Sequence, residues 1–317
     1  MGFRIRIPAT VALASLAILA SGAKPAPSMP HPPPLLRARA ADNAACEGCH
    51  TGIAAEWRQS LHRTSFTDAD FQRGLTRDPD PFCRGCHAPE SDPKLGVACV
   101  TCHVTNADVL ATPGSSSSTA PHALTRTPEF ATNAACAKCH EFDFPDANLR
   151  NKPLAMQRTI SEHRGRSDTC ATCHMTKKDG HADHRFAASR DDAFVKSAVT
   201  IRARRVGPDR IEVVLEPALV GHAFPTGDLF RRVRVSAGRE NRFLARHYAN
   251  RQEVPGVLVR SEISDDRVQG GDRIVEMKVP AEKTRVRVVY ERAEGPSATT
   301  SSSATVAGSI ELFDAEL

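Results

Sequence analysis

The chain has 317 residues, which is enough for about two domains of ordinary size. Its formal net charge of +5 and its 25% content of charged residues are ordinary for a soluble protein and give no case for nucleic-acid binding. Aromatic residues make up only 5%, with one Trp and two Tyr, which is thin for two well-filled cores. The composition therefore indicates that something other than aromatic side chains fills part of the interior.

Residues 1–23 have the features of a secretory signal peptide. Two arginines precede an apolar stretch over residues 7–20, and small residues follow it. A membrane anchor is the alternative, but the apolar stretch is short for a membrane span. We therefore expect an exported protein, periplasmic or secreted, from which this leader is cleaved. Residues 24–41 are rich in proline and are expected to form an extended tether at the mature N-terminus.

Residues 42–190 hold all ten cysteines, in five pairs with two residues between the members and a histidine directly after each pair. The cysteines are Cys46/Cys49, Cys83/Cys86, Cys99/Cys102, Cys136/Cys139 and Cys170/Cys173, and the histidines are His50, His87, His103, His140 and His174. In a Cys-x-x-Cys-His motif the thiols form thioethers with the two vinyl groups of one haem, and the histidine ligates its iron. The pattern predicts five covalently attached c-type haems.

Zinc sites and disulfides are the alternatives for paired cysteines. Zinc does not require a histidine after every second cysteine, and five disulfides that each close a two-residue loop would do little to stabilise a fold. Export also suits c-type haem, whose attachment is completed outside the cytoplasm. Five ferric haems with their propionates would bring the mature chain from about +3 to about −2, so the sequence charge says little about partners.

The haem region is predicted to consist of short helices and loops wrapped around stacked haems. Apolar residues at a spacing of four predict a helix over Ile53–Arg63, and Leu154–His163 is a second candidate. The second and third motifs lie close in sequence, so we expect their haems to be close in space. The sequence Asn-Ala-Ala-Cys opens the motif at 43–46 and again at 133–136, which suggests duplication of a haem-binding unit.

After about Asp191 the cysteines stop and the alternation typical of strands begins. Strands are predicted over Ala198–Arg204, Ile211–Glu216, Arg232–Ser236, Arg273–Val279, Arg285–Tyr290 and Val306–Phe313. These segments predict an all-β, sandwich-like domain over residues 191–317.

Eight of the 13 histidines lie outside the motifs and could occupy the second axial position of an iron. This surplus predicts bis-histidine ligation. His62 ends the first predicted helix, His122 lies in a loop before the fourth motif, and His163 shortly precedes the fifth. Of His181 and His184 one is expected to be a ligand, and His184 is preferred.

The fifth candidate ligand is His222, inside the predicted β domain. Gly221, Pro225 and Gly227 surround it and predict a stiff, tightly turning loop that projects one side chain. We expect this loop to lean on the haem domain, so that His222 would tie the two domains together.

These segments resemble the multihaem c-type cytochrome family that includes tetrahaem cytochrome c-554 and hydroxylamine oxidoreductase. The resemblance lies in the five motifs, in the helix with Trp57, Ser60 and His62, in residues 170–175, and in residues 221–227. It implies that the segments of His62 and His163 deliver distal ligands. The haem number differs from both named members, so their ligation patterns and substrates do not carry over.

The predicted function is extracytoplasmic electron transfer, because irons with both axial sites filled pass electrons but do not bind substrate. The alternative is an oxidoreductase in which one haem is open and acts on a small nitrogen or sulfur compound. Redox proteins are the expected partners, and association with a membrane or outer-surface redox complex is compatible with export. The β domain would dock such a partner.

Overall fold

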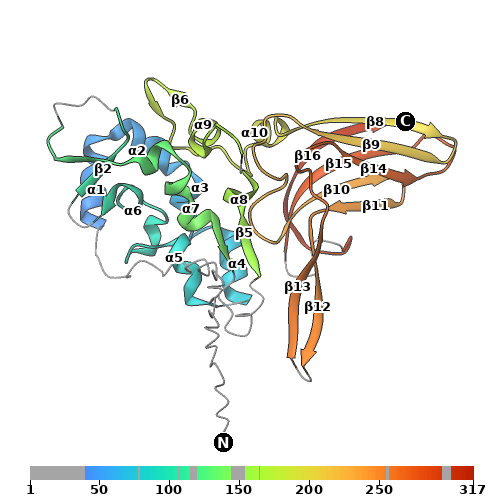
Figure 1. Ribbon diagram of the computed structural model, residues 1–317, viewed down its shortest axis with the longest axis horizontal. Helices are drawn as coiled ribbons and strands as arrows, with labels where there is room; N and C mark the ends of the chain where they lie inside the picture. The colour runs from blue at the N-terminus through green and yellow to red at the C-terminus, as the bar shows by residue number, and fades with distance from the viewer. Residues whose placement is uncertain are drawn as a thin grey trace, which may run out of the picture.

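In the computed structural model, helices and strands follow one another in two parts of the chain (Figure 1). The structure describes residues 40–77, 79–105, 108–114, 120–143, 154–163, 165–254, 257–294 and 301–317. We call residues 40–196 the helical part and residues 199–317 the β part. The predicted signal peptide and nearly all of the predicted tether lie outside the described residues.

Short helices and two- to four-residue strands make up the helical part. The α-helices are α1 (Ala40–Cys49), α2 (Thr51–Arg58), α3 (Leu61–Thr64), α4 (Ala69–Arg77), α5 (Arg84–His87), α6 (Cys99–His103), α7 (Ala134–His140), α8 (Thr159–Glu162), α9 (Cys170–His174) and α10 (Asp192–Lys196). The small strands are β1 (Val104–Thr105), β2 (Asp108–Ala111), β3 (Leu124–Arg126), β4 (Glu141–Asp143), β5 (Ala155–Arg158), β6 (Lys177–Lys178) and β7 (His181–Ala182). The 3₁₀ turns are η1 (Pro81–Cys83), η2 (Pro93–Leu95) and η3 (Pro128–Ala131).

The helix predicted over Ile53–Arg63 is two helices, so this prediction was wrong in its extent. The Ser60 side chain accepts a hydrogen bond from the Arg63 amide at 3.1 Å and caps a new helix, α3. An N-cap residue has extended backbone, which is incompatible with a continuous helix through that position. The break turns α3 toward the third motif, where the Val97 amide donates to the His62 carbonyl at 2.8 Å.

The helix predicted over Leu154–His163 is helical only in its second half. Residues of β5 pair with β4, which leaves α8 to begin at Thr159. A carboxylate oxygen of Glu141 accepts the amides of Ile160 at 3.0 Å and Ser161 at 3.1 Å. A carboxylate suits a helix N-terminus because the first amides have no intrahelical partner.

Two sheets form the body of the β part. One has the order β11-β10-β15-β16 and the other the order β14-β9-β8, with antiparallel neighbours throughout. The strands are β8 (Val199–Gly207), β9 (Arg210–Pro217), β10 (Arg231–Ala237), β11 (Glu240–Leu244), β14 (Arg273–Lys278), β15 (Arg285–Ala293) and β16 (Val306–Glu316). All six predicted strands coincide with observed ones, and β11 is additional.

One apolar core lies between these sheets. Ile211, Val213 and Leu215 alternate along β9 and are 0% exposed, and residues of β10, β14 and β15 complete the same cluster. Alternation with period two puts every second side chain on the same face of a strand. A hairpin of β12 (Arg246–Val254) and β13 (Val257–Asp265) projects away from this body (Figure 1) and was not predicted.

The two parts meet around α8, which lies at their junction in Figure 1. Glu162 at the end of α8 accepts from Arg267 at 2.7 Å and from the Thr226 hydroxyl at 2.6 Å. The side chains of Glu162 and Arg267 are only 6% and 3% exposed. Because a buried charge left unpaired is costly, this pair ties the junction to one geometry.

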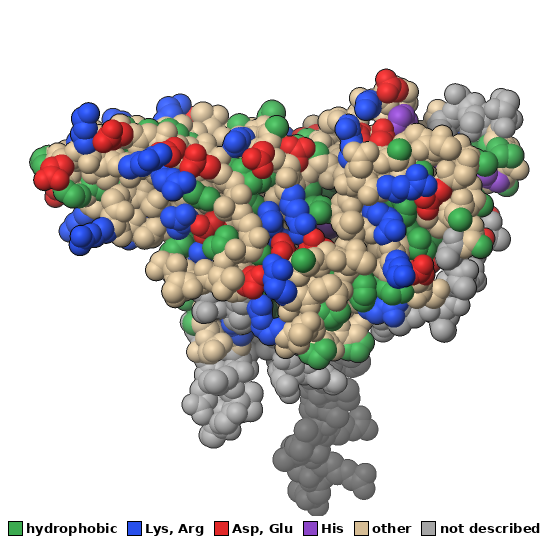
Figure 2. All heavy atoms as spheres, turned by 180° about the vertical axis from the view of Figure 1, so that it is seen from behind, with side chains coloured by type: hydrophobic (Ala, Val, Ile, Leu, Met, Phe, Trp, Pro, Cys, Tyr) green, Lys and Arg blue, Asp and Glu red, His purple; other side chains and the backbone are tan. Residues whose placement is uncertain are grey.

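A second set of contacts between the parts is more exposed. On α4, Arg73 pairs with Glu294 at 2.7 Å and Asp70 pairs with Arg292 at 3.3 Å. Figure 2 shows basic and acidic side chains gathered between the two parts on the face opposite that of Figure 1. Exposed pairs contribute about 0–1 kcal/mol each, so the buried pair of α8 is the stronger tie.

Candidate haem-binding site

Each of the five motifs lies on a short helix or helical turn. The first motif ends α1, the second spans η1 and α5, and the other three lie on α6, α7 and α9. Positions i, i+3 and i+4 share one helix face, so this local structure turns both cysteines and the histidine of a motif to the same side. All ten cysteines are described and none of them forms a disulfide.

The structure places four motif histidines opposite a second histidine. The ring centroids are 6.5 Å apart for His50 and His122, 6.2 Å for His140 and His62, 6.3 Å for His103 and His184, and 6.2 Å for His174 and His222. Two metal–imidazole bonds of about 2 Å and about 1 Å from each ligating nitrogen to its ring centroid add up to about 6 Å. Each centroid separation therefore matches that expected for one metal ion between two imidazoles.

The fifth motif histidine, His87, has a different neighbour. The Phe71 ring stacks on it with centroids 3.9 Å apart and planes at 14°. No second histidine ring faces His87 among the residues that the structure describes. The remaining described histidines, His163, His181 and His247, all have other partners. His31 lies outside the described residues.

Backbone carbonyls fix the tautomer of His87 and of several facing histidines. The Nδ1 atoms lie within hydrogen-bond distance of a carbonyl oxygen in His87 (Ser65, 2.9 Å), His103 (Leu110, 3.0 Å), His174 (Ala187, 2.6 Å), His184 (Ala182, 2.7 Å) and His222 (Ala223, 2.9 Å). A carbonyl only accepts, so Nδ1 carries the proton and donates it. The lone pair of Nε2 is then free for a metal, the arrangement common to metal-ligating histidines.

The structure places His163 apart from the motif histidines, although it was predicted as a distal ligand. Asn133 Oδ1 accepts the Cys170 amide at 2.8 Å, so its Nδ2 is the atom that faces His163 Nδ1, at 3.2 Å. An amide nitrogen donates, so His163 Nδ1 accepts and its proton lies on Nε2, which is 3.8 Å from an oxygen of Asp168. This is the reverse of the ligand tautomer.

In His181 and His247 a carboxylate lies beside Nε2. His181 Nε2 lies 3.1 Å from Glu56, and His247 Nε2 lies 2.8 Å from Asp266. Of the pair that the sequence left open, His184 therefore faces a motif histidine and His181 does not. In His181 and His247 a carboxylate therefore occupies Nε2, and no sequence pattern carried that signal.

Burial disfavours the charged form of four of the facing imidazoles. It lowers the pKa of His62 to about 3, with the neighbouring imidazoles of His140 and His174 acting in the same direction. Burial likewise lowers the pKa of His140, His184 and His222. A ligating imidazole must be deprotonated at the metal-binding nitrogen, so these surroundings favour ligation.

The loop that carries His222 is held by both parts of the chain. Phe224 pairs through its backbone with Val268, at 2.8 and 3.0 Å. Arg267 donates to the Pro225 carbonyl at 3.0 Å while it pairs with Glu162 of α8. The loop thus leans on the helical part, and the His222 ring is nearly parallel to that of His174, at 16°.

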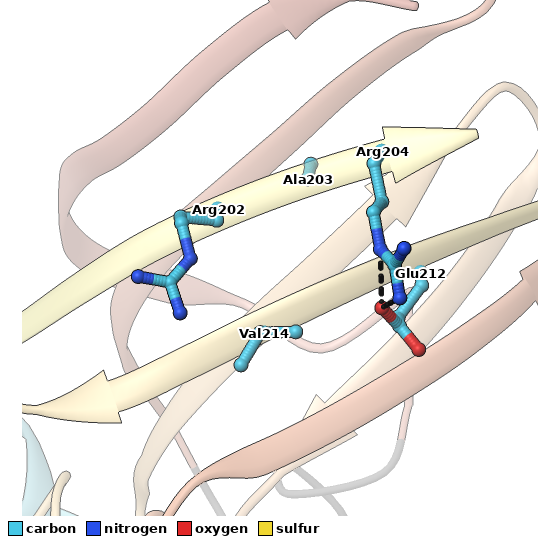
Figure 3. Close-up of a pocket in the computed structure, with 5 residues that line it drawn as sticks. All are labelled: Arg202, Ala203, Arg204, Glu212 and Val214. Atoms are coloured by element: carbon cyan, nitrogen blue, oxygen red, sulfur yellow. Dashed lines mark hydrogen bonds and ion pairs between the residues drawn. The ribbon is translucent and has the colours of Figure 1, made fainter. Parts of the chain in front are cut away.

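A shallow hollow on the outer face of β8 and β9 offers no comparable chemistry (Figure 3). Arg202, Arg204 and Glu212 line it with two apolar residues. Arg204 is paired with Glu212 at 2.8 Å, and Arg202 is paired with Glu216. Its cations are already neutralised by carboxylates of the same sheet, so we place the functional site at the motifs.

The fold of this chain is similar to that of a solved structure. The chain is similar to the penta-haem cytochrome c552 from Thermochromatium tepidum, with a TM-score of 0.65 and 19% identity, over 84% of this chain and 97% of that one. The fold is multihaem cytochrome c-like. No family model and no curated protein matches the chain. The narrower likeness to cytochrome c-554 and hydroxylamine oxidoreductase stays a prediction.

The same comparison bears on the β part, since a match over 84% of the chain extends beyond the helical part. The multihaem cytochrome c-like fold of this chain therefore includes strands of the β part as well as the motif helices. In the part of the chain that the structure describes, no helix is long and apolar enough to cross a membrane.

Proposed function

We propose that this protein transfers electrons outside the cytoplasm through five covalently bound c-type haems. The observation that carries the proposal is the set of four facing histidine pairs with ring centroids 6.2–6.5 Å apart. Iron held between two imidazoles cycles between its ferric and ferrous states, which is the chemistry that the haems supply.

The chain's own residues have distinct roles in this proposal. Cysteines of the five motifs bind the haems, and the motif histidines are the proximal ligands. His122, His184, His62 and His222 are the distal ligands opposite His50, His103, His140 and His174, respectively. Backbone carbonyls at Nδ1 hold several of these imidazoles in one orientation, so little rearrangement accompanies a change of charge on the iron.

Redox proteins are the proposed donor and acceptor. A signal peptide over residues 1–23 and export to the periplasm or beyond belong to the same proposal, because c-type attachment is completed outside the cytoplasm. Since His222 comes from the β part, we propose that this part belongs to the electron-transfer unit and also docks the partner, with a membrane or outer-surface redox complex as one setting.

The haem count tests this proposal directly. By intact mass spectrometry, the mass of the mature protein should exceed that of the cleaved chain by roughly 3 kDa. This is the mass of five haems, which remain attached because thioethers survive denaturation. Electron paramagnetic resonance of the oxidised protein should show at least four low-spin haems. A lower haem count, or a majority of high-spin irons, would contradict the proposal.

A second candidate function is favoured by the surroundings of His87. Among the described residues no histidine faces it, so the iron over the second motif would keep an open axial site. An open site is what an oxidoreductase acting on a small nitrogen or sulfur compound needs, because the substrate must bind at the iron. Electron transfer by the other four haems would serve that site.

Carbon monoxide distinguishes the two candidates. If the His87 haem is open, the reduced protein should bind about one carbon monoxide per chain, and the oxidised protein should show one high-spin haem in five. Turnover of nitrite and hydroxylamine would then be measured. If the protein binds no carbon monoxide, all five irons are six-coordinate and the second candidate is rejected.

A further inference from the structure

Each of the two Asn-Ala-Ala-Cys segments binds the helix that carries a later motif. Asn43 is 0% exposed, and its Oδ1 accepts the Val100 amide in the first turn of α6 at 3.4 Å. Asn133 Oδ1 accepts the Cys170 amide at the start of α9 at 2.8 Å. In both cases an asparagine three residues before one motif binds the helix that carries another motif.

The two helices that the asparagines bind, α6 and α9, also resemble each other in sequence. Both α6 and α9 have the sequence Cys-x-Thr-Cys-His, and both use the threonine in the same way. The Ala98 amide donates to Thr101 Oγ1 at 3.1 Å, and the Thr169 amide donates to Thr172 Oγ1 at 3.2 Å. The second motif has neither feature, because Asp80 stands in place of the asparagine and Gly85 in place of the threonine.

Both pairs of motifs are in direct proximity. Cys136 and Cys170 approach through their thiols, and Cys46 lies beside Cys99 and packs on the cluster that contains Val100. Cys102 of the third motif lies near Cys139 of the fourth, so the two pairs adjoin each other. Because the thiols attach to the edges of the haems, the two haems of each pair would lie side by side. The first and third motifs thus form one pair, and the fourth and fifth form another.

The side-chain amide of each asparagine is also oriented by a hydrogen bond from its Nδ2 atom. Asn43 Nδ2 donates to Glu47 at 2.8 Å, and Arg58 holds Glu47 at 2.9 Å. Asn133 Nδ2 donates to His163, which packs so tightly on Gly221 that an added Cβ would lie 2.8 Å from the ring. This contact accounts for the burial of His163.

We infer that the haem region contains two copies of one two-haem module, in which Asn43 and Asn133 are positioning residues that set the geometry of the haem pairs. The first module holds the haems of the first and third motifs, and the second holds those of the fourth and fifth. The haem of the second motif lies outside both modules, with Cys86 beside Cys139 of the second module. This inference rests on the proposed binding of five haems.

The arrangement makes each module an electronically coupled pair. With haems bound, two ferric haems held close together would interact magnetically, and reducing one would lower the affinity of the other for an electron. Removing an asparagine takes away one hydrogen bond of its partner helix and gives that helix more freedom to shift. Coupling inside one module should therefore weaken, while the other module serves as an internal control.

The test compares Asn133→Ala with Asn43→Ala in the full-length, haem-loaded protein. Intact mass first establishes that five haems remain. Asn133→Ala should convert the coupled paramagnetic signals of two haems into signals of isolated low-spin haems and shift their midpoint potentials, and Asn43→Ala should do so for the other two. His222→Ala and His122→Ala, which label one haem of each module by a high-spin signal, assign the affected haems.

A conservative variant separates positioning from general destabilisation. Asn133→Asp keeps the acceptor for the Cys170 amide and should retain the coupled signals. Loss of a haem from Asn133→Ala with the first module intact also supports the inference. Unchanged coupling in both alanine variants, or the same change in both modules from either one, overturns it. If mass spectrometry finds no haems in the wild type, the proposed function has failed instead.

Discussion

Replacing His222 by alanine is the sharpest perturbation of the proposed ligand set. The ring lies 6.2 Å from that of His174 and is nearly parallel to it, so its removal opens one axial position and no other. The haem should stay attached through Cys170 and Cys173. The backbone pairing of Phe224 with Val268, at 2.8 and 3.0 Å, should hold the loop in place. One haem in five should therefore become high-spin and bind about one additional carbon monoxide per chain.

The assay is electron paramagnetic resonance of the oxidised variant together with carbon monoxide titration of the reduced one. Added imidazole should enter the vacated space and restore the low-spin signal. His247→Ala is the matched control, because His247 also lies in the β part but binds Asp266 through Nε2 at 2.8 Å, and it should leave the spectrum unchanged. A fully low-spin His222→Ala protein with five haems would refute the ligand assignment.

Two further substitutions test neighbouring parts of the argument. His163→Ala should keep five haems and the wild-type proportion of low-spin iron, because its Nδ1 accepts from Asn133 instead of facing a motif histidine; a new high-spin haem would show that it is a ligand after all. Glu162→Ala should lower the free energy of unfolding by about 3 kcal/mol, the lower end of the range for breaking a buried pair, since Asp265 still pairs with Arg267. Denaturant titration measures this, with Glu311→Ala, which breaks the exposed pair with Arg287, expected to change it by less than about 1 kcal/mol.

Local sequence predicted the strands of the β part well. In β9, buried and less buried residues alternate, and the predicted segment Ile211–Glu216 lies within the observed strand Arg210–Pro217. This works because the period of two is imposed by the backbone itself. The hairpin of β12 and β13, which projects from the body of the β part (Figure 1), was missed.

Helices in the haem region were predicted less well. Between Ile53 and Arg63 the apolar spacing of four continues across Ser60, yet the serine caps a new helix there. Over Leu154–His163 the pairing of β5 with β4 overrides the helical pattern. Short helices bury too little of their own surface to be stable alone, so capping and long-range contacts decide where they begin and end.

The sequence by itself determined the motifs, because covalent attachment of a haem requires only two cysteines at a fixed spacing and the histidine after them. It also showed a surplus of histidines. Only the tertiary structure decided which of these face a motif histidine, since His62 and His140 are far apart in the chain yet 6.2 Å apart in space. It also separated His184 from His181 and His222 from His163, because the role of an imidazole depends on which groups occupy its two nitrogens.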